Sequence, residues 1–481
     1  MGFRQQPVQV LINKFTRSVA LPFQEVLPSK TIEEVIIELG IKYRSRLYNP
    51  IVIIWSFLSQ VLDTDHSCKN AVSRIIAYLV GEGQERPSEN TGAYCRARIK
   101  LPELLFKKLV DISAENLEKE VDKKSLWHGR HVKSIDGSSV SMADTEENQK
   151  AYPQHSSQKE GCGFPLAAIG VLFSYCTGAV IGITIDTWST HDINLARQLS
   201  KYLEVGDILL GDRAFCAYTD ICLWIKQKCD VVSRLHQGRV TKGKKRPKHT
   251  IIEDSNNQNK KKKRSRKAPH DRLILWEKPK IKPKDISQKD FDSLPKDLVL
   301  REVHAYICIP GFRTKEIIVV TTLLDSIEYP ASDLLKLYDD RWSAEINLRH
   351  IKTTLEMDIL SCKTPEMVRK EIYTYLLAYN LLRTIMYQAG NLCARDPVRL
   401  SLQATRQHLK NFTPEFIRKT KVPGQKIYKI KIYKIMLETV ADSYQKPRVG
   451  RVEPRVKKRR PKAYPLMQEP RSILRDQMKA S

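Results

Sequence analysis

The order of apolar segments between residues 131 and 238 constrains the fold most. HVKSIDGSSVSM predicts a strand, a turn at Asp136-Gly137 and a second strand. FPLAAIGVLFSYCTGAVIGITIDTWS predicts a hairpin that turns at CTGA. A helix, a buried strand in GDILLGDRAF, a second helix and a further strand follow. Strands in a meander followed by alternating helices and strands predict an α/β fold, with a mixed sheet covered by helices.

Helical spacing dominates the first part of the chain. Residues 1–125 are expected to form a helical, DNA-binding domain, because apolar residues recur at helical intervals between 30 and 122. The segment SKTIEEVIIELGI carries a capping box at its start. Basic residues near the predicted turns suit DNA binding: Lys69, Arg74, Arg96, Arg98 and Lys100.

The remaining chain divides into four parts. Residues 126–238 are expected to form the first part of the α/β core. Residues 239–325 break the alternation of strands and helices, and predict a β-rich insertion with a basic run. Residues 326–400 resume the core with a helix around Tyr338, and residues 401–481 form a C-terminal helical region with a basic tail. That tail, from about residue 446, is expected to be disordered.

Charge is concentrated in two segments. The 481 residues carry 82 Lys and Arg against 54 Asp and Glu, a net charge of +28. Residues 239–267 hold thirteen basic residues against two acidic ones, and residues 446–479 hold twelve against three. Such an excess predicts a polyanionic partner, because each cation placed on a phosphate releases counterions. Both segments are interpreted as basic arms, and contact of the first with the DNA backbone is a hypothesis that rests on charge alone.

The cysteines and apolar runs indicate where the chain works. The ten cysteines include no CxxC pair, and no signal peptide precedes them, which predicts a reducing cytoplasm. The apolar run at 51–62 is too short to cross a membrane and predicts a core helix. The expected location is therefore the cytoplasm, in association with the nucleoid.

Four polar residues share one face if residues 338–352 form a single helix: Tyr338, Arg341, Glu345 and Lys352. At about 100° per residue their side chains fall within a narrow stripe. The stripe suits either an ordinary salt-bridged surface or a site that binds a metal beside a polyanion. Glu356 returns to the same face and is a rival carboxylate.

Two aspartates stand next to predicted strands. Asp136 ends the first strand of the core, and Asp212 follows the buried strand DILLG. Side chains at strand ends of α/β sheets project into the crevice where ligands bind, so the two can meet if their strands are neighbours. With Glu345 as a third carboxylate they would suit Mg²⁺ or Mn²⁺, two ions being the arrangement used for displacement at phosphorus. Either aspartate alone is also a common turn former or helix cap.

Together these motifs resemble a known family. Tyr338, Arg341, Glu345 and Lys352 reproduce the Tyr-Arg-Glu-Lys signature of bacterial insertion-sequence transposases of the insertion-sequence-four type, which carry an Asp-Asp-Glu triad. SIDGSSVSM and GDILLGDRAF are similar to the two Asp blocks of that family. FLSQVLDTDHSCKNAVSRI and TGAYCRARIKLP are similar to its amino-terminal region. The resemblance covers residues 30–420.

The resemblance implies a ribonuclease-H-like core and a complete set of functional residues. Asp136, Asp212 and Glu345 would be catalytic and would hold two Mg²⁺ or Mn²⁺ ions. Tyr338, Arg341 and Lys352 would contact phosphates of double-stranded DNA. The protein would bind the terminal inverted repeats of its transposon as a homodimer, cleave DNA at the ends and transfer strands to target DNA by phosphoryl transfer.

The sequence leaves open which tryptophan would stack a flipped base and which of three related functions the chain has. Some relatives stack a flipped base on a Trp in the strand before the signature helix, whereas KEIIVVTTLL has none. Trp276 is a candidate for that role, although a core position suits it better, and Trp342 is expected to pack its helix on the sheet. The function could also be that of a nuclease derived from such an element, or of a non-catalytic DNA-binding protein.

Overall fold

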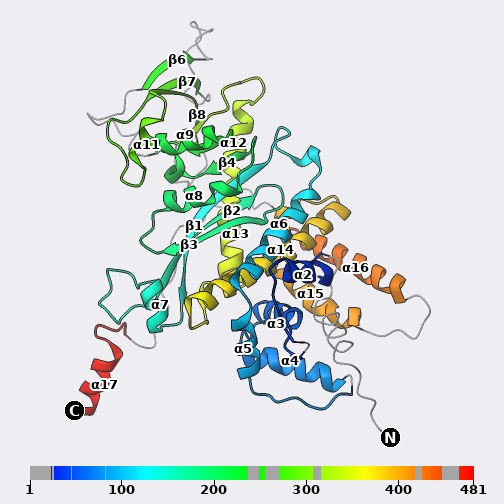
Figure 1. The fold of residues 1–481 in the computed structure, drawn as a ribbon. Helices are drawn as coiled ribbons and strands as arrows, with labels where there is room; N and C mark the ends of the chain where they lie inside the picture. The colour runs from blue at the N-terminus through cyan, green and yellow to red at the C-terminus, as the bar shows by residue number, and fades with distance from the viewer. Residues whose placement is uncertain are drawn as a thin grey trace.

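The computed structural model describes residues 26–44, 46–81, 83–236, 249–254, 270–306, 316–417, 425–446 and 465–480, together with Phe23. One mixed sheet runs through the molecule, and helices from both ends of the chain gather against it (Figure 1). The predicted α/β class is confirmed. None of the described helices is long and apolar enough to span a membrane.

Five strands form the first half of the sheet in the order β3-β2-β1-β4-β5. They are β1 (Val132–Met142), β2 (Leu166–Ser174), β3 (Val180–Thr187), β4 (Ile208–Gly211) and β5 (Asp230–Arg234). β1, β2 and β3 form an antiparallel meander, while β4 and β5 run parallel to β1. The predicted hairpin is therefore present, and the buried strand of GDILLGDRAF lies directly beside β1.

A single continuous strand replaces the predicted strand, turn and strand at Asp136-Gly137. β1 pairs with β2 without interruption, with Asp136 opposite Val171 and Gly137 opposite Gly170. The two glycines leave room for a helix, since a Cβ on Gly170 would lie 2.9 Å from the Cβ of Leu195. The prediction of a turn was wrong because here Gly137 serves close packing instead of chain reversal.

The predicted β-rich segment extends the same sheet. β9 (Glu316–Thr321) pairs antiparallel with β5, and β8 (Asp297–Tyr306), β7 (His270–Glu277) and β6 (His249–Asp254) follow in that order. Strands were expected here, and they continue the core sheet edge to edge. Most of the basic run 239–267 lies outside the described residues.

Helices cover both faces of the first half of the sheet. α8 (Asp192–Leu199) and α9 (Tyr218–Lys226) pack against a cluster that contains Ile135 and Leu172. α6 (Glu103–Lys119) and α14 (Pro365–Leu392) belong to the main core together with the alternate β2 residues, such as Val171. This alternation follows from the two-residue period of a strand. In α14, 22 of the 28 residues are buried, so this helix forms the centre of the main core.

The predicted amino-terminal helices are present. They are α2 (Ser29–Glu38), α3 (Pro50–Leu62), α4 (Cys68–Gly81), α5 (Gly92–Lys100) and α6. The capping box was wrong, because no side chain bonds to the start of α2, whose N-cap is Pro28. Pro28 offers no side-chain acceptor, so the preceding backbone alone sets this helix start.

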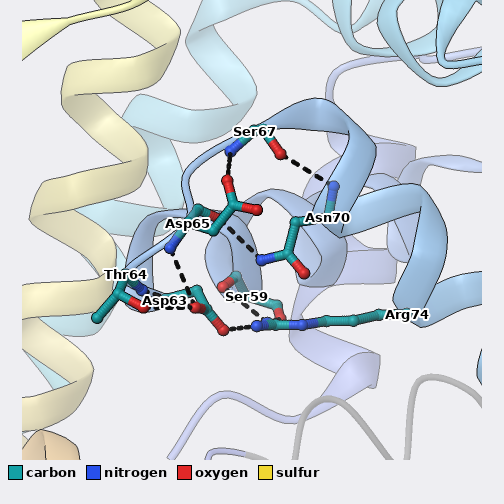
Figure 2. A network of polar contacts seen from close by, with 7 residues as sticks. All are labelled: Ser59, Asp63, Thr64, Asp65, Ser67, Asn70 and Arg74. Atoms are coloured by element: carbon teal, nitrogen blue, oxygen red, sulfur yellow. Dashed lines mark hydrogen bonds and ion pairs between the residues drawn. The ribbon is translucent and has the colours of Figure 1, made fainter.

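A closed polar network fixes the joint between α3 and α4 (Figure 2). Asp63 accepts the backbone N–H groups of Thr64, at 2.7 Å, and Asp65, at 3.1 Å, and also pairs with the guanidinium of Arg74. Asp65 in turn accepts the N–H of Ser67 at 2.9 Å. Arg74 therefore stabilises the joint between the two helices.

Arg98 is also used inside the protein. Its guanidinium lies 4.1 Å from the ring centroid of Phe57 and donates to Gln60 at 2.9 Å and to the thiol of Cys362 at 3.4 Å. Of the basic residues expected to face DNA, Arg98 is therefore buried and was wrong, whereas Arg74 is partly exposed and its contact with DNA stays a prediction. Lys69, Arg96 and Lys100 are exposed.

The carboxyl-terminal part is helical, as predicted. It contains α15 (Leu402–Ile417), α16 (Gln425–Asp442) and α17 (Arg471–Ala480), which lies away from the body in Figure 1. The expectation of disorder from 446 was wrong for α17, and residues 447–464 lie outside the described residues. The other described elements are α7 (Glu146–Ala151), α11 (Gln288–Asp292), α12 (Ala331–Asp340), α13 (Trp342–Arg349) and β10 (Ile359–Leu360).

Candidate active site

The register of β1 against β4 brings the two aspartates together. Val132 pairs with Ile208 and Ser134 with Leu210, an offset of 76 residues. The same offset (212 − 136 = 76) places Asp136 level with Asp212, one residue beyond the end of β4. The sequence predicted that Asp136 ends its strand. This was wrong, because β1 continues to Met142. The neighbouring strand ends instead, and this exposes the side of β1 at the level of Asp136.

Asp212 has two structural contacts of its own. Its carboxylate accepts the N–H of Ala214 at 2.6 Å, which starts the short helix Arg213–Phe215, and its carbonyl accepts the hydroxyl of Ser233 at 2.7 Å. Both contacts fix the backbone of Asp212 at the edge of the sheet. The helix-cap interpretation and the site interpretation are therefore both compatible with this residue, since one carboxylate has several lone pairs.

The signature segment is not one helix. α12 ends at Asp340, α13 begins at Trp342, and Arg341 stands at the junction. The chain then forms a π-helical turn, His350–Thr354, whose wider spacing alters the angular positions calculated for an ideal helix. The prediction of a single helix was wrong: α12, with Tyr338, packs against β5, β8 and β9, whereas α13, with Glu345, packs against β1.

Glu345 and Arg341 pair with each other in this arrangement. The guanidinium donates to the Glu345 carboxylate at 2.9 Å, and the two side chains are 13% and 36% exposed. The ring of Tyr338 lies next to this pair, with its centroid 5.8 Å from the Arg341 guanidinium. Tyr338 is itself buried, and this burial raises the pKa of its hydroxyl.

Electrostatics connect the three carboxylates. Burial raises the pKa of Asp136 to about 6, and the negative charges of Glu345 and Asp212 add to the rise. The N–H of Gly137, which donates to Asp136 at 2.9 Å, and the charge of Arg341 act in the opposite direction. A raised carboxyl pKa caused partly by like charges marks a site whose negative charge is only partly compensated, here by Arg341.

Lys352 reaches the same strand from the π-helical turn. Its ammonium donates to the hydroxyl of Ser138 at 2.9 Å, two residues beyond Asp136 and on the same side of β1. Burial lowers the pKa of this ammonium. Lys352 is thus placed within the same region as the carboxylates.

The rival carboxylate and the two tryptophans can be placed as well. Glu356 follows the helical segment in a left-handed conformation, with φ of +67°, and is exposed. Trp276 is a core residue, 1% exposed, as expected, whereas Trp342 is 54% exposed. The expectation that Trp342 packs its helix on the sheet was wrong.

Sequence reasoning missed one carboxylate. Asp192, in the first turn of α8, lies so close to β1 that a Cβ on Gly137 would stand 2.8 Å from its Oδ1. Burial raises the pKa of Asp192, and the charge of Asp212 adds to the rise. The signal available in the sequence was an acid at a helix start directly after a strand, a pattern that is too common to select one residue.

A divalent cation fits the donors of this site. Carboxylate oxygens are the ligands that Mg²⁺ and Mn²⁺ prefer, and the like charges around Asp136 would be relieved by a cation. In the described part of the chain, however, no three acidic, histidine or cysteine side chains converge closely enough to hold an ion as they stand. Binding therefore requires side chains to rotate, and Glu345 is the one that an ion pair holds.

These features match a family of enzymes by sequence. The transposase DDE domain family matches residues 127–381, which is more than half of the chain and includes β1, β4 and the signature segment. The chain belongs to this family.

Two individual proteins are similar to it. Transposase InsG for insertion sequence element IS4, from Escherichia coli (strain K12), is 22% identical over 362 residues, which is 75% of each chain. The predicted resemblance to the insertion-sequence-four type is thereby confirmed. The piggyBac transposase, in a synaptic complex with hairpin DNA solved by cryo-EM, aligns over 90% of this chain and 86% of its own, with a TM-score of 0.39 and 11% identity.

Proposed function

We propose that the chain is a metal-dependent DNA transposase that binds the terminal inverted repeats of its transposon, cleaves DNA at the ends and transfers strands to target DNA. The single observation that carries this proposal is the register that sets Asp136 level with Asp212, beside Glu345. Membership of the transposase DDE domain family supports transposition as the overall activity.

A ribonuclease-H-like core is part of the proposal. The strand order β3-β2-β1-β4-β5, with an antiparallel meander followed by parallel strands, supports it. In this interpretation β6 to β9 are the insertion between β5 and α12, and they lengthen the sheet away from the site.

Asp136, Asp212 and Glu345 would hold Mg²⁺ or Mn²⁺, two ions in all. Once bound, such ions activate a water and stabilise the charge that develops on the attacking and leaving oxygens at phosphorus. The carboxylates of Asp136, on β1, and Asp212, just after β4, each accept one backbone N–H, from Gly137 and Ala214 respectively. Glu345 comes from a separate helix and closes the site from the side.

Arg341 and Lys352 would bind phosphates of the terminal DNA. The planar guanidinium of Arg341 can bind a phosphate through two hydrogen bonds, whereas the ammonium of Lys352 acts as a point charge. The buried ring of Tyr338 lies under Arg341 and supports a positioning role for Tyr338 in phosphate binding.

A hairpin intermediate would need an exposed aromatic side chain for an extruded base. Trp342 is more than half exposed and follows Arg341 directly, which supports Trp342 for that task in preference to the buried Trp276. The proposed protein works as a homodimer on two transposon ends, in the cytoplasm and on the nucleoid.

The test is a cleavage assay with Mg²⁺ and DNA that carries the inverted repeats flanking the gene. Parent protein is expected to cut at the ends and join them to target DNA, and Asp212→Asn and Glu345→Gln are expected to do neither. Glu356→Gln, at the exposed rival carboxylate, is the matched control and should keep activity. Cleavage without joining would favour a derived nuclease, and binding without cleavage a regulatory protein; both results would overturn the proposal.

A further inference from the structure

The ion pair between Arg341 and Glu345 joins two residues whose proposed tasks are different. One task is to bind a DNA phosphate and the other is to bind a metal. The Arg341 guanidinium and the Glu345 carboxylate are 2.9 Å apart. While this contact lasts, Arg341 is partly neutralised as an anion-binding group, and Glu345 is partly neutralised as a cation-binding group.

Arg341 retains capacity for a further acceptor. Its Nε is buried and has no hydrogen-bond partner within the described residues. A buried donor without an acceptor is destabilising, so a ligand that reaches it gains more than an exposed contact would supply. An i,i+4 pair such as Arg341–Glu345 contributes only tenths of a kcal/mol on an isolated helix. A phosphate that accepts from two guanidinium nitrogens can therefore replace Glu345.

A large cavity gives such a phosphate access to Arg341. Its volume is about 1810 Å³, and Arg341, Tyr338 and Trp342 line it. Other charged residues also line it: the cations Arg234, Lys336, Arg349, Arg399 and Lys446, and the acids Asp339, Asp340 and Asp396. The cavity is larger than the 300–1,000 Å³ typical of small-molecule pockets, and its excess of cations over acids suits a strand of nucleic acid.

The other side of the pair faces the carboxylates. α13, which carries Glu345, packs against β1, the strand that carries Asp136. Removing Arg341 from Glu345 would therefore leave three carboxylates with less counter-charge between them. Such a cluster binds divalent cations more tightly.

We propose that Arg341 couples DNA binding to metal binding, by holding Glu345 until a DNA phosphate in the cavity takes its place. This inference rests on the proposed function of the site. The coupling is reciprocal, so that DNA tightens the binding of metal and metal tightens the binding of DNA by the same factor. The metal site is then completed only where DNA already lies in the cavity, which restrains cutting elsewhere.

The experiment measures Mn²⁺ affinity of the full chain by calorimetry, with and without a duplex that carries a transposon end. Added duplex is expected to tighten Mn²⁺ binding by about 5-fold or more. Arg341→Gln frees Glu345, so it should bind Mn²⁺ more tightly than the parent without DNA, and the duplex should then have little further effect. Arg341→Lys, which can still pair with Glu345, should retain part of the coupling and shows whether position 341 tolerates substitution.

Lys434→Gln is the control, because it removes one positive charge from α16, at an exposed residue that does not line the cavity. A tightening of equal size in Lys434→Gln would reduce the effect to general electrostatics and would overturn the coupling. Parent protein whose Mn²⁺ affinity ignores DNA would overturn it as well. Glu345→Gln separates the two proposals. If Glu345→Gln leaves Mn²⁺ binding unchanged, the proposed metal site itself fails. If Glu345→Gln weakens binding while Arg341→Gln changes nothing, only the coupling fails.

Discussion

Two clusters of acidic residues in this chain behave in opposite ways. At the joint between α3 and α4, Asp63 and Asp65 accept backbone N–H groups, and Asp63 also pairs with Arg74 (Figure 2). The backbone N–H of Ser67 holds the pKa of Asp65 below its usual value. At the end of β4, burial and the charges of Glu345 and Asp212 raise the pKa of Asp136 instead.

The difference distinguishes a structural network from a functional one. The joint satisfies its carboxylates internally, and every charge there has a partner that fixes the chain. The candidate active site leaves like charges facing one another, which opposes folding unless a ligand compensates. Substitutions in the two clusters should therefore have separable effects, on stability at the joint and on activity at the site.

The largest effect is expected at the end of β4. Loss of an outer-shell partner of a metal typically reduces activity about 10–100-fold. Asp212→Asn should reduce DNA cleavage by more than this, because it removes a proposed direct ligand. Its melting temperature should change little, since Asn can still accept from Ala214. Cleavage assays with thermal unfolding on the same sample test both statements. An active Asp212→Asn protein would remove the distinction between the clusters.

The stability of the site should depend on pH. The folded-state pKa of Asp136, about 6, lies above the roughly 3.9 of an unfolded aspartate. Its ionisation therefore costs nothing below about pH 4 and lowers stability progressively as the pH rises to about 6. Without metal, Asp136→Asn should be more stable than the parent by roughly 1–3 kcal/mol at pH 8 and similar at pH 4. Urea unfolding at both pH values measures this, and a gain of the same size at pH 4 would count against the account.

At the joint between α3 and α4, removing a carboxylate should lower the stability of the protein instead of raising it. Asp63→Ala removes a mostly buried carboxylate, 10% exposed, and leaves Arg74 and two backbone N–H groups without it. We expect a loss of about 1–3 kcal/mol in unfolding free energy, with the cleavage rate of the folded protein unchanged. Urea titration and a cleavage assay below the unfolding transition test this. A variant that folds normally but fails to cut would place the joint in the catalytic machinery.

The smallest expected effect concerns DNA binding. Lys352→Ala should weaken binding to transposon ends and make the salt dependence of log K shallower by about 0.9, the contribution of one phosphate contact. Lys434→Ala, at an exposed cation on α16, is the control and should leave the slope as it is. Filter binding at several salt concentrations gives both slopes. Equal slopes for parent and Lys352→Ala would exclude a phosphate contact at Lys352.

The α/β class of the fold could be predicted from sequence, since strand and helix periodicity are local signals. From the sequence, Asp136 and Asp212 could meet only if their strands are neighbours, and the register of β1 against β4 sets them level. The turn at Asp136-Gly137 was predicted wrongly, because the same dipeptide also serves where a strand needs close packing. The break at Arg341 and the π-helical turn at Lys352 have no strong local signature. They depend on packing against β1, which involves residues more than 200 positions away.

The contacts that each basic side chain makes could not be predicted from the sequence either. Sequence alone does not distinguish four basic residues of the amino-terminal helices: Lys69, Arg74, Arg96 and Arg98. In the structure, Arg74 binds Asp63 and Arg98 lies against Phe57. Which cations a fold uses internally depends on contacts between separate helices. The exposure of Trp342 was likewise hidden, because a large aromatic on a helix is usually a packing residue.

The most direct measurement maps where a divalent ion binds. With a duplex transposon end present, Fe²⁺ replaces Mg²⁺, and a reductant and peroxide then generate radicals that cut the polypeptide close to the ion. A shared metal site predicts cuts next to Asp136, Asp212 and Glu345 together, all lost in Asp212→Asn. Cuts confined to other segments, or cuts that persist unchanged in Asp212→Asn, would contradict a shared metal site at these three carboxylates.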